Sequence, residues 1–436
     1  MEWDTGATAW MLVSASLVLL MTPGLAFFYG GMVRAKSVLN MMMMSFGAMG
    51  IIGVVYVLWG WSMSYGSDIG GIIGNPFDQF GLSGTIFDES GAAVSSTLGN
   101  YPQVVDVAFQ VTFAIITTAL ISGAIADRVK YGSWLVFTGI WVTLAYFPLA
   151  HMVWGGGFLS GSEDGLAAKI FGVTDGAATV APIDFAGGTV VHINAGVAGL
   201  VLVLLIGARK GFGKEPMRPH NLPFVMLGAA LLWFGWFGFN AGSAFGANET
   251  AGLAWVNTTS AAAAAILGWL VTEKIRDGHA TSLGAASGVV AGLVAITPAA
   301  GALSPVGAII LGAVAGALCA LAVGLKYRFG YDDSLDVVGV HLVGGLVGTI
   351  GIGFLATEGG LFYGDGGKLL VIQVVVALFA VIFSGVVTLV VGLAIKATLG
   401  WRITEDQEVG GIDLAVHGES AYETLGGGRV IKEVRS

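Results

Sequence analysis

Apolar runs of 18 or more residues recur along the whole chain, and they restrict its possible folds more than any other feature. A helix needs about 20 apolar residues to cross the hydrocarbon core of a bilayer, which is about 30 Å thick. Polar breaks divide the chain into eleven segments of suitable length, so we predict an all-α polytopic membrane protein. The expected spans are 8–29, 38–64, 104–126, 133–155, 186–207, 222–242, 250–272, 282–300, 305–325, 336–356 and 369–395.

The composition agrees with a membrane protein and excludes other classes. Of the 436 residues, 55% are hydrophobic and 11% are charged, whereas a soluble domain usually carries about 25% charged residues. The net charge of -9 has the wrong sign for nucleic-acid binding. A single cysteine, Cys319, excludes a disulfide framework. Because Cys319 lies in an apolar run with no nearby base, we expect a packing residue rather than a nucleophile.

The basic residues predict the orientation of the chain. Seventeen of the 19 Lys and Arg fall in the breaks after spans 1, 3, 5, 7 and 9 or in the tail, and only Lys169 and Lys368 fall on the other side. The positive-inside rule therefore places the N-terminus outside and the tail in the cytoplasm. The first span follows Met-Glu-Trp-Asp, which lacks the positive start of a cleaved signal, so we expect it to be retained. The long outer loops at 65–103 and 156–185 are acidic, which fits either a vestibule that attracts cations or ordinary solvated loops.

A short motif occurs twice and indicates an internal repeat. The stretch that begins His192-Ile-Asn-Ala-Gly resembles the one that begins His341-Leu-Val-Gly-Gly, and an aspartate precedes each, Asp184 and Asp336. Five helices separate the copies, so they run in opposite directions, which predicts two inverted halves with the solute path between them. A chance match stays open because the chain has 70 glycines. The expected parts are 1–207 and 208–356 as the halves, an eleventh helix within 357–396, and a tail at 397–436.

Ionisable groups at membrane depth are candidates for function, and His151, His192 and His341 are of this kind. His192 and His341 each lie roughly 8–9 Å along their helices, so they approach the membrane centre from opposite sides. Three interpretations stay open: a neutral pair that lines a narrow path, a metal site, or imidazoles bound to backbone carbonyls. The metal site lacks a carboxylate or thiolate at ligand spacing. His220, His279 and His417 lie in polar breaks or the tail, where we expect them to be solvated.

Asp184 and Asp336 come just before spans 5 and 10. An aspartate there can cap the helix by accepting backbone N–H bonds, and we expect this role for both, with some electrostatic support for a nearby cation.

Aromatic residues crowd the expected outer ends of several spans, among them Phe109, Phe113, Trp154 and Phe239. Such residues often form an interfacial belt. Together with a hydroxyl such as that of Ser243, their faces could also hold a monovalent cation as it loses water. A phenylalanine constriction below would exclude hydrated ions.

Four stretches resemble the ammonium transporter (Amt) family, which is related to the Rhesus glycoproteins. They begin Thr22-Pro-Gly-Leu-Ala-Phe-Phe-Tyr, Asp184-Phe-Ala-Gly-Gly-Thr, Trp236-Phe-Gly-Phe-Asn-Ala and Gly339-Val-His. The resemblance covers essentially the whole chain. It implies a homotrimer in the cell membrane, in which each subunit has eleven helices and its own pore between inverted five-helix halves, and it implies ammonium or methylammonium as the solute.

The resemblance also implies roles for individual residues. Trp154, Phe109 and Ser243 would line an outer ammonium site. Phe113 and Phe239 would form a gate below it. His192 and His341 would pair in the pore. Asp184 matches an aspartate below the vestibule that serves recognition and structure.

The tail from Gly410 to Tyr422 is also similar to that of the family, in which a PII-type signalling protein blocks the pores from the cytoplasm. The tail is expected to lie on the cytoplasmic face, with a disordered tail as the alternative. The residues after Tyr422 have no match that we can align.

The expected mechanism is loss of a proton at the gate and passage as neutral ammonia, with or without separate proton transfer along the histidines. Three other functions stay open. An ammonium sensor would bind without much conduction, a Rhesus-type gas channel would lack the aromatic site, and a membrane enzyme would need a nucleophile with its base or a metal centre. We expect no catalytic residue, metal or cofactor.

Overall fold

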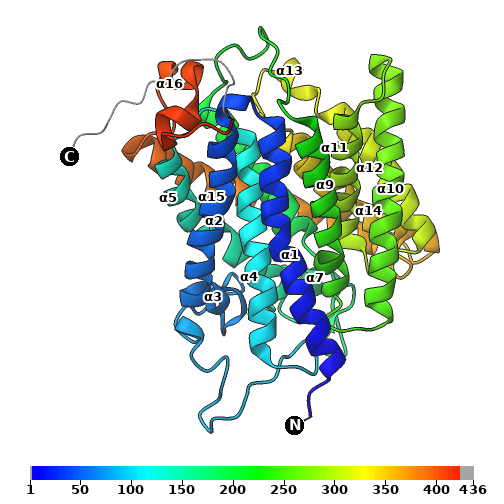
Figure 1. Cartoon of the computed structure of the whole chain (residues 1–436). Coiled ribbons are helices and arrows are strands. Elements are labelled where there is room, and N and C mark those ends of the chain that lie inside the picture. Colours follow the sequence, from blue (N-terminus) through cyan, green and yellow to red (C-terminus); the bar gives the residue numbers. More distant parts are fainter. Residues whose placement is uncertain (1, 423–436) are drawn as a thin grey trace.

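The computed structural model describes residues 2–422, which form a bundle of long, roughly parallel and antiparallel helices (Figure 1). Within these residues, eleven helical spans are long and apolar enough to cross a membrane, which confirms the predicted number. The helices are α1 (Thr5–Met32), α2 (Val38–Val55), α3 (Trp61–Tyr65), α4 (Gln103–Ile121), α5 (Tyr131–Trp141), α6 (Phe147–Trp154), α7 (Leu166–Phe171), α8 (Asn194–Ile206), α9 (Leu222–Trp236), α10 (Glu249–Asp277), α11 (Ser282–Ile296), α12 (Pro305–Ala322), α13 (Leu325–Phe329), α14 (Val343–Leu355), α15 (Lys368–Thr398) and α16 (Glu405–Gly410).

Shorter elements complete the fold. Five π-helical segments extend or interrupt spans: η2 (Tyr56–Gly60), η5 (Val142–Tyr146), η6 (Gly188–Ile193), η7 (Phe237–Ala241) and η9 (Val338–Leu342); a sixth, η11 (Asp413–His417), lies in the tail. Two small antiparallel hairpins lie in the loops, β1 (Asp68–Ile69) with β2 (Ile73–Gly74), and β3 (Val173–Thr174) with β4 (Ala177–Ala178).

The observed spans begin and end close to the predicted positions. The largest difference is in the seventh span, which was expected to end at residue 272 but continues to Asp277. Its last turn carries Lys274 and Arg276, and cations are favoured at the C-terminal end of a helix dipole. The helix therefore extends beyond the apolar segment from which it was predicted.

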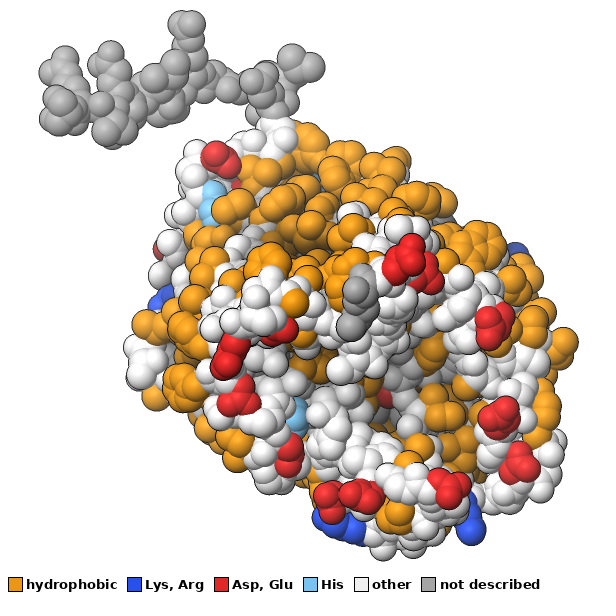
Figure 2. All heavy atoms as spheres, turned by 90° about the horizontal axis from the view of Figure 1, so that it is seen from below, with side chains coloured by type: hydrophobic (Ala, Val, Ile, Leu, Met, Phe, Trp, Pro, Cys, Tyr) orange, Lys and Arg blue, Asp and Glu red, His pale blue; other side chains and the backbone are white. Residues whose placement is uncertain are grey.

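The two ends of the bundle differ. The N-terminus and the loops 66–102 and 155–187 lie at one end, here called the long-loop face; the tail and α16 lie at the other, the tail face (Figure 1). Figure 2 shows the long-loop face, where acidic side chains gather around a hollowed centre. The exposed acidic residues of its two long loops are Asp68, Asp78, Asp88, Glu89, Glu163, Asp164 and Asp175.

Small residues bring helices into backbone contact. A Cβ atom at Gly312 or Gly316 of α12 would lie 2.2 Å from the carbonyl oxygen of Ala261 or Ala265 in α10. Because a real Cβ cannot approach so closely, only glycine allows these two helices to meet at this separation. In a membrane, where lipid provides no hydrophobic drive between helices, such close contact stabilises the bundle through dispersion.

The two copies of the repeated motif contact each other in a symmetrical way. A Cβ at Gly196, four residues after His192, would lie 2.5 Å from the backbone nitrogen of Leu342. A Cβ at Gly345, four residues after His341, would lie 3.2 Å from the backbone nitrogen of Ile193. Each glycine thus admits the residue that follows the histidine of the other copy. The two motifs therefore pack against each other through equivalent positions.

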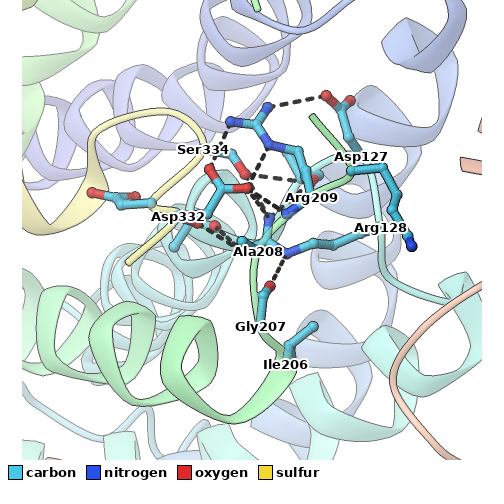
Figure 3. A network of polar contacts seen from close by, with 12 residues as sticks. Asp127, Arg128, Ile206, Gly207, Ala208, Arg209, Asp332 and Ser334 are labelled. Atoms are coloured by element: carbon cyan, nitrogen blue, oxygen red, sulfur yellow. Dashed lines mark hydrogen bonds and ion pairs between the residues drawn. The ribbon is translucent and has the colours of Figure 1, made fainter. Parts of the chain in front are cut away.

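A buried charge network at the tail face joins segments that are far apart in the sequence (Figure 3). Arg209, which follows α8, donates to Asp332 over 2.8 Å and to Asp127 over 3.1 Å. Arg128 donates to the carbonyl of Gly207 and to Ser334. Burial opposes ionisation of Asp332, but the bonds from Arg209 outweigh it and hold the pKa of Asp332 below its usual value. Burial lowers the pKa of Arg128 to about 10.

The tail up to Tyr422 is ordered against the tail face, as expected from the resemblance. The carboxylate of Asp413 accepts hydrogen bonds from the backbone nitrogens of Asn40, over 2.8 Å, and Leu39, over 3.0 Å, at the start of α2. Glu408 pairs with Arg402 over 2.6 Å and accepts a bond from the backbone of Lys210 over 2.7 Å. The residues after Tyr422 lie outside the described part of the chain.

Candidate functional site

A cavity of about 390 Å³ lies beneath the long-loop face. Its walls combine aromatic rings with a few hydroxyl and amide groups, and they come from spans and loops far apart in the sequence. The lining residues are Tyr65, Leu98, Gln110, Phe113, Val153, Trp154, Gly156, Ser160, Gly161, Ser162, Phe185, Ser243 and Phe245.

Three of the predicted site residues, Trp154, Phe113 and Ser243, line this cavity. Phe109 does not. It is fully buried, with its ring centroid 4.7 Å from that of Phe113, so it supports the wall from behind. The hydroxyl of Ser243 donates to the carbonyl of Phe239 over 2.8 Å, which leaves the oxygen lone pairs as neutral acceptors. The arrangement offers π faces and an uncharged oxygen, which suit a small cation.

Two stacked phenyl rings close the inner end of the cavity. The centroids of Phe113 and Phe239 are 4.1 Å apart, and the ring planes are inclined by 22°. Both side chains are buried. Phe113 belongs to α4 and Phe239 to η7, so the constriction forms only when these two segments, far apart in the sequence, come together.

Beyond the rings, His192 and His341 face each other, which their positions in the sequence could not establish. Their Nδ1 atoms are 3.3 Å apart and their ring planes are inclined by 18°. One ring must therefore carry the hydrogen on Nδ1 and the other must accept it. The Nε2 atom of His192 is buried without a partner in the described chain. The space here is about 10 Å³, close to the minimum for a single water molecule.

Trp236 fixes the ring of His192 from the other side. The two rings are stacked at 5.6 Å with an angle of 16°. The indole N–H of Trp236 donates to the hydroxyl of Thr297 over 2.8 Å. The walls around the histidines are otherwise apolar, so each imidazole is positioned by stacking and by the other histidine rather than by charged groups.

Asp184 connects the cavity to the histidine segment. Its carboxylate accepts backbone N–H bonds from Gly187 and Thr189 at 2.9 and 3.0 Å, and it also accepts from Gly188 and Val190. This confirms the predicted capping role, because η6 with His192 begins at Gly188. The carbonyl of Asp184 accepts the indole N–H of Trp154 over 2.8 Å. Burial raises the pKa of Asp184, although these hydrogen bonds favour the ionised form.

The expected capping role is wrong for Asp336. Its backbone is left-handed, with φ at 65°, and its carboxylate pairs with Lys326 over 2.7 Å. Asp333, three residues earlier, accepts the backbone N–H of Val337 and Val338 instead. An aspartate caps a helix only when its carboxylate reaches the free N–H groups of the first turn, and the turn at 333–336 gives that position to Asp333.

Cys319 and the histidines outside the pair are buried or bound to neighbouring protein groups in several cases. Cys319 is buried, as expected. His151 binds the carbonyl of Ser64, in agreement with the third interpretation of the membrane histidines. The expected solvation is wrong for His417, which is half-buried and lies 3.0 Å from the side-chain oxygen of Asn40. It is also incomplete for His220, which lies 3.0 Å from the carbonyl of Val33.

Several cavity residues were not anticipated, because they lie in irregular loops or show no distinctive motif. Gln110 follows Phe109 directly and provides an amide at the cavity wall. Phe245 lies two residues after Ser243 with a left-handed backbone, so no helical periodicity indicates its position. Within residues 2–422, no three His, Cys, Asp or Glu side chains are grouped as metal ligands.

Comparison with known proteins agrees with this architecture. The Ammonium Transporter Family profile matches residues 9–422. An ammonium transporter of Mycobacterium tuberculosis is 56% identical, over 96% of this chain and 91% of the relative. The crystal structure of Saccharomyces cerevisiae Mep2 superposes with a TM-score of 0.80 at 31% identity, over 93% of this chain and 91% of that one. The structure titled Sensor Amt Protein gives a TM-score of 0.81 at 26% identity, over 94% and 98%. The chain therefore belongs to the ammonium transporter family, whose named relatives are transporters rather than enzymes.

Proposed function

We propose that this protein takes up ammonium at the cavity beneath the long-loop face and conducts it inward as ammonia. Trp154, Ser243 and the wall supported by Phe109 bind the cation. Phe113 and Phe239 act as the gate, and His192 with His341 line the path beyond it. The proposal rests mainly on one observation, the stacked phenyl pair directly above two facing imidazoles in an otherwise apolar, very narrow space.

The physical reason for deprotonation is the cost of moving a bare ion into this space. Desolvating an ammonium-sized ion in a low-dielectric interior costs several kcal/mol even after relaxation. The described walls around the histidines carry no carboxylate that would offset this cost. Neutral ammonia needs only hydrogen-bonding partners, which two imidazoles provide as one donor and one acceptor per neutral ring.

The histidines give the direct test. Uptake of labelled methylammonium into proteoliposomes should be lost, or lose its selectivity over potassium, in His192→Ala and in His341→Ala. The exposed loop histidine His279 supplies the matched control, because His279→Ala removes the same group far from the path. Normal uptake with full exclusion of potassium in both single variants would overturn the pore assignment.

Separate proton transfer along the histidines is a second part of the proposal. If the released proton follows the ammonia, an ammonium pulse on protein-containing liposomes evokes a current. A pulse that drives uptake without current would show electroneutral transport and refute this part alone. The sensor alternative predicts binding with little flux, so the turnover in the same liposomes distinguishes sensor from transporter.

The remaining assignments are also proposals. We infer a homotrimer in the cell membrane, with the long-loop face outside and the tail face in the cytoplasm, and with 1–207 and 208–356 as the inverted halves. The uneven distribution of Lys and Arg supports this orientation. A PII-type protein would bind at the tail face, where the ordered tail lies. The mass of the detergent-solubilised protein and proteolysis of sealed vesicles test the assembly and the orientation.

A further inference from the structure

His151 is a buried imidazole that the proposed path does not use. It lies in α6 three residues before Trp154 and has no exposed surface. Its Nδ1 is 3.0 Å from the carbonyl oxygen of Ser64, and its Nε2 is 2.8 Å from Oδ1 of Asp68. The Asp68 side chain is 49% exposed on the long-loop face. A fully buried ring therefore contacts a group that is open to the medium.

His151 can form hydrogen bonds to both of its partners only if an additional proton is present. A backbone carbonyl only accepts hydrogen bonds, and so does an ionised carboxylate. A neutral imidazole has one N–H, so it can donate to Ser64 or to Asp68 but not to both. Both bonds form only when the pair holds one further proton. The hydrogen bond from His151 is the main reason that the pKa of Asp68 lies below its usual value.

This pair fastens the β1–β2 hairpin to the chain segment that lines the cavity. The carbonyl of Gly71, in the hairpin turn, accepts the backbone N–H of Phe158 over 2.7 Å. Gly155 passes directly over the His151 bond, since a Cβ there would lie 2.2 Å from the Ser64 oxygen and 2.7 Å from Nδ1 of His151. Trp154 and Gly156, on either side of Gly155, line the cavity. The bond between His151 and Ser64 therefore lies in direct contact with the segment that forms this part of the cavity wall.

The surrounding elements hold few other groups that could supply the proton. Around α6, α3 contributes Tyr65 and η5 contributes Tyr146. The element η6 contributes His192, which faces His341 instead, and β2 carries no titratable residue. Asp68 is therefore the charged group in direct contact with the imidazole.

We propose that His151 and Asp68 form a pair that positions Trp154 at the outer cation site. Both hydrogen bonds of His151 form only when the pair holds its additional proton. The affinity of the site for the cation therefore falls as the pH at the long-loop face rises. The inference rests on the proposed role of the cavity as the ammonium site. His151 acts through Trp154 and does not touch the solute.

The decisive variant is Asp68→Asn, which alters an exposed residue and should leave the fold intact. An asparagine amide can donate to Nε2 while Nδ1–H donates to Ser64, so a neutral imidazole satisfies both bonds at any pH. The control is Asp164→Asn, which removes the same charge from an exposed position on the other long loop. Initial rates of methylammonium uptake into cells, at a series of external pH values, give KM expressed as cation concentration.

For the unmodified protein and Asp164→Asn, KM should rise about tenfold across the series, which corresponds to about 1.4 kcal/mol and matches the loss of one hydrogen bond to a charged group. The maximal rate should change little. In Asp68→Asn, KM should stay constant. The same pH dependence in all three proteins would overturn the inference. Trp154→Leu is measured in parallel to test the outer site independently. An unchanged KM in this variant would refute the proposed outer site itself. A raised KM would support that site, and the result for Asp68→Asn would then test only the role of the His151–Asp68 pair.

Discussion

Gly196→Ala is the sharpest test of how the contact between α8 and η9 brings the histidines together. The added methyl group would lie 2.5 Å from the nitrogen of Leu342 and 2.6 Å from its Cβ. Carbon atoms in contact prefer about 3.5 Å, so α8 and η9 would have to separate by about 0.9 Å. Leu342 follows His341, and the same displacement would lengthen the 3.3 Å contact with His192 to about 4 Å, beyond a hydrogen bond.

The overlap involves backbone atoms, so side-chain rotation cannot relieve it. Overpacking of this kind costs about 1–3 kcal/mol, which the bundle should survive. We expect folded protein with methylammonium uptake reduced by about tenfold or more, since displacements of about 1 Å at a reacting centre have effects of this size or larger.

Gly385→Ala in α15 is the matched control, because its Cβ would meet only the side chain of Val197 at an ordinary 3.5 Å. The assay compares uptake into liposomes with thermal unfolding in detergent for both variants. Gly196→Ala with unchanged uptake and unchanged unfolding would refute the reasoning that this close contact sets the histidine geometry.

Three further predictions concern stability and the site. Arg209→Met should lower the free energy of unfolding by about 3 kcal/mol in detergent melts, because it removes the cation shared by two buried carboxylates and, within the described residues, leaves Asp127 only Arg34, at 3.1 Å, and Asp332 only Arg128, at 3.9 Å. Arg276→Met, whose ion pair is exposed, should change it by less than about 1 kcal/mol. The pKa of Asp332 is lower than its ordinary value, so its ionised form stabilises the fold above about pH 4, and this contribution is lost as the pH falls further. Thermal melts between about pH 5 and pH 3 should therefore show a loss of stability that Asp332→Asn abolishes. Asp184→Asn removes acceptors from the start of η6 and should reduce uptake more than it reduces expression, and equal uptake would contradict its positioning role.

The spans were predictable from sequence because a bilayer demands long apolar helices with internal hydrogen bonds. The same constraint explains why the end of α10 was missed, since its last turn lies beyond the apolar segment and depends on Lys274 and Arg276. The motif around Asp184 indicated a cap correctly because the glycines that follow it expose several N–H groups.

The site was predictable only in part. The facing of His192 and His341 depends on Gly196 and Gly345, whose contacts span about 150 residues of sequence, so no local pattern reveals it. The left-handed turn at Asp336 transferred capping to Asp333, and spacing alone cannot distinguish two aspartates three residues apart.

The contact between Asp413 and the start of α2 affects how shortened chains should be interpreted. Ser37, the residue before that helix, makes no capping bond with its own side chain, so the free N–H groups rely on a carboxylate supplied more than 370 positions later. A deletion series that removes Asp413 therefore also frays the entrance of a membrane helix. Loss of transport in such deletions can therefore result from a destabilised α2 as well as from the loss of regulation by the tail. Replacing Asp413 alone by Asn in the intact chain separates these two effects more cleanly.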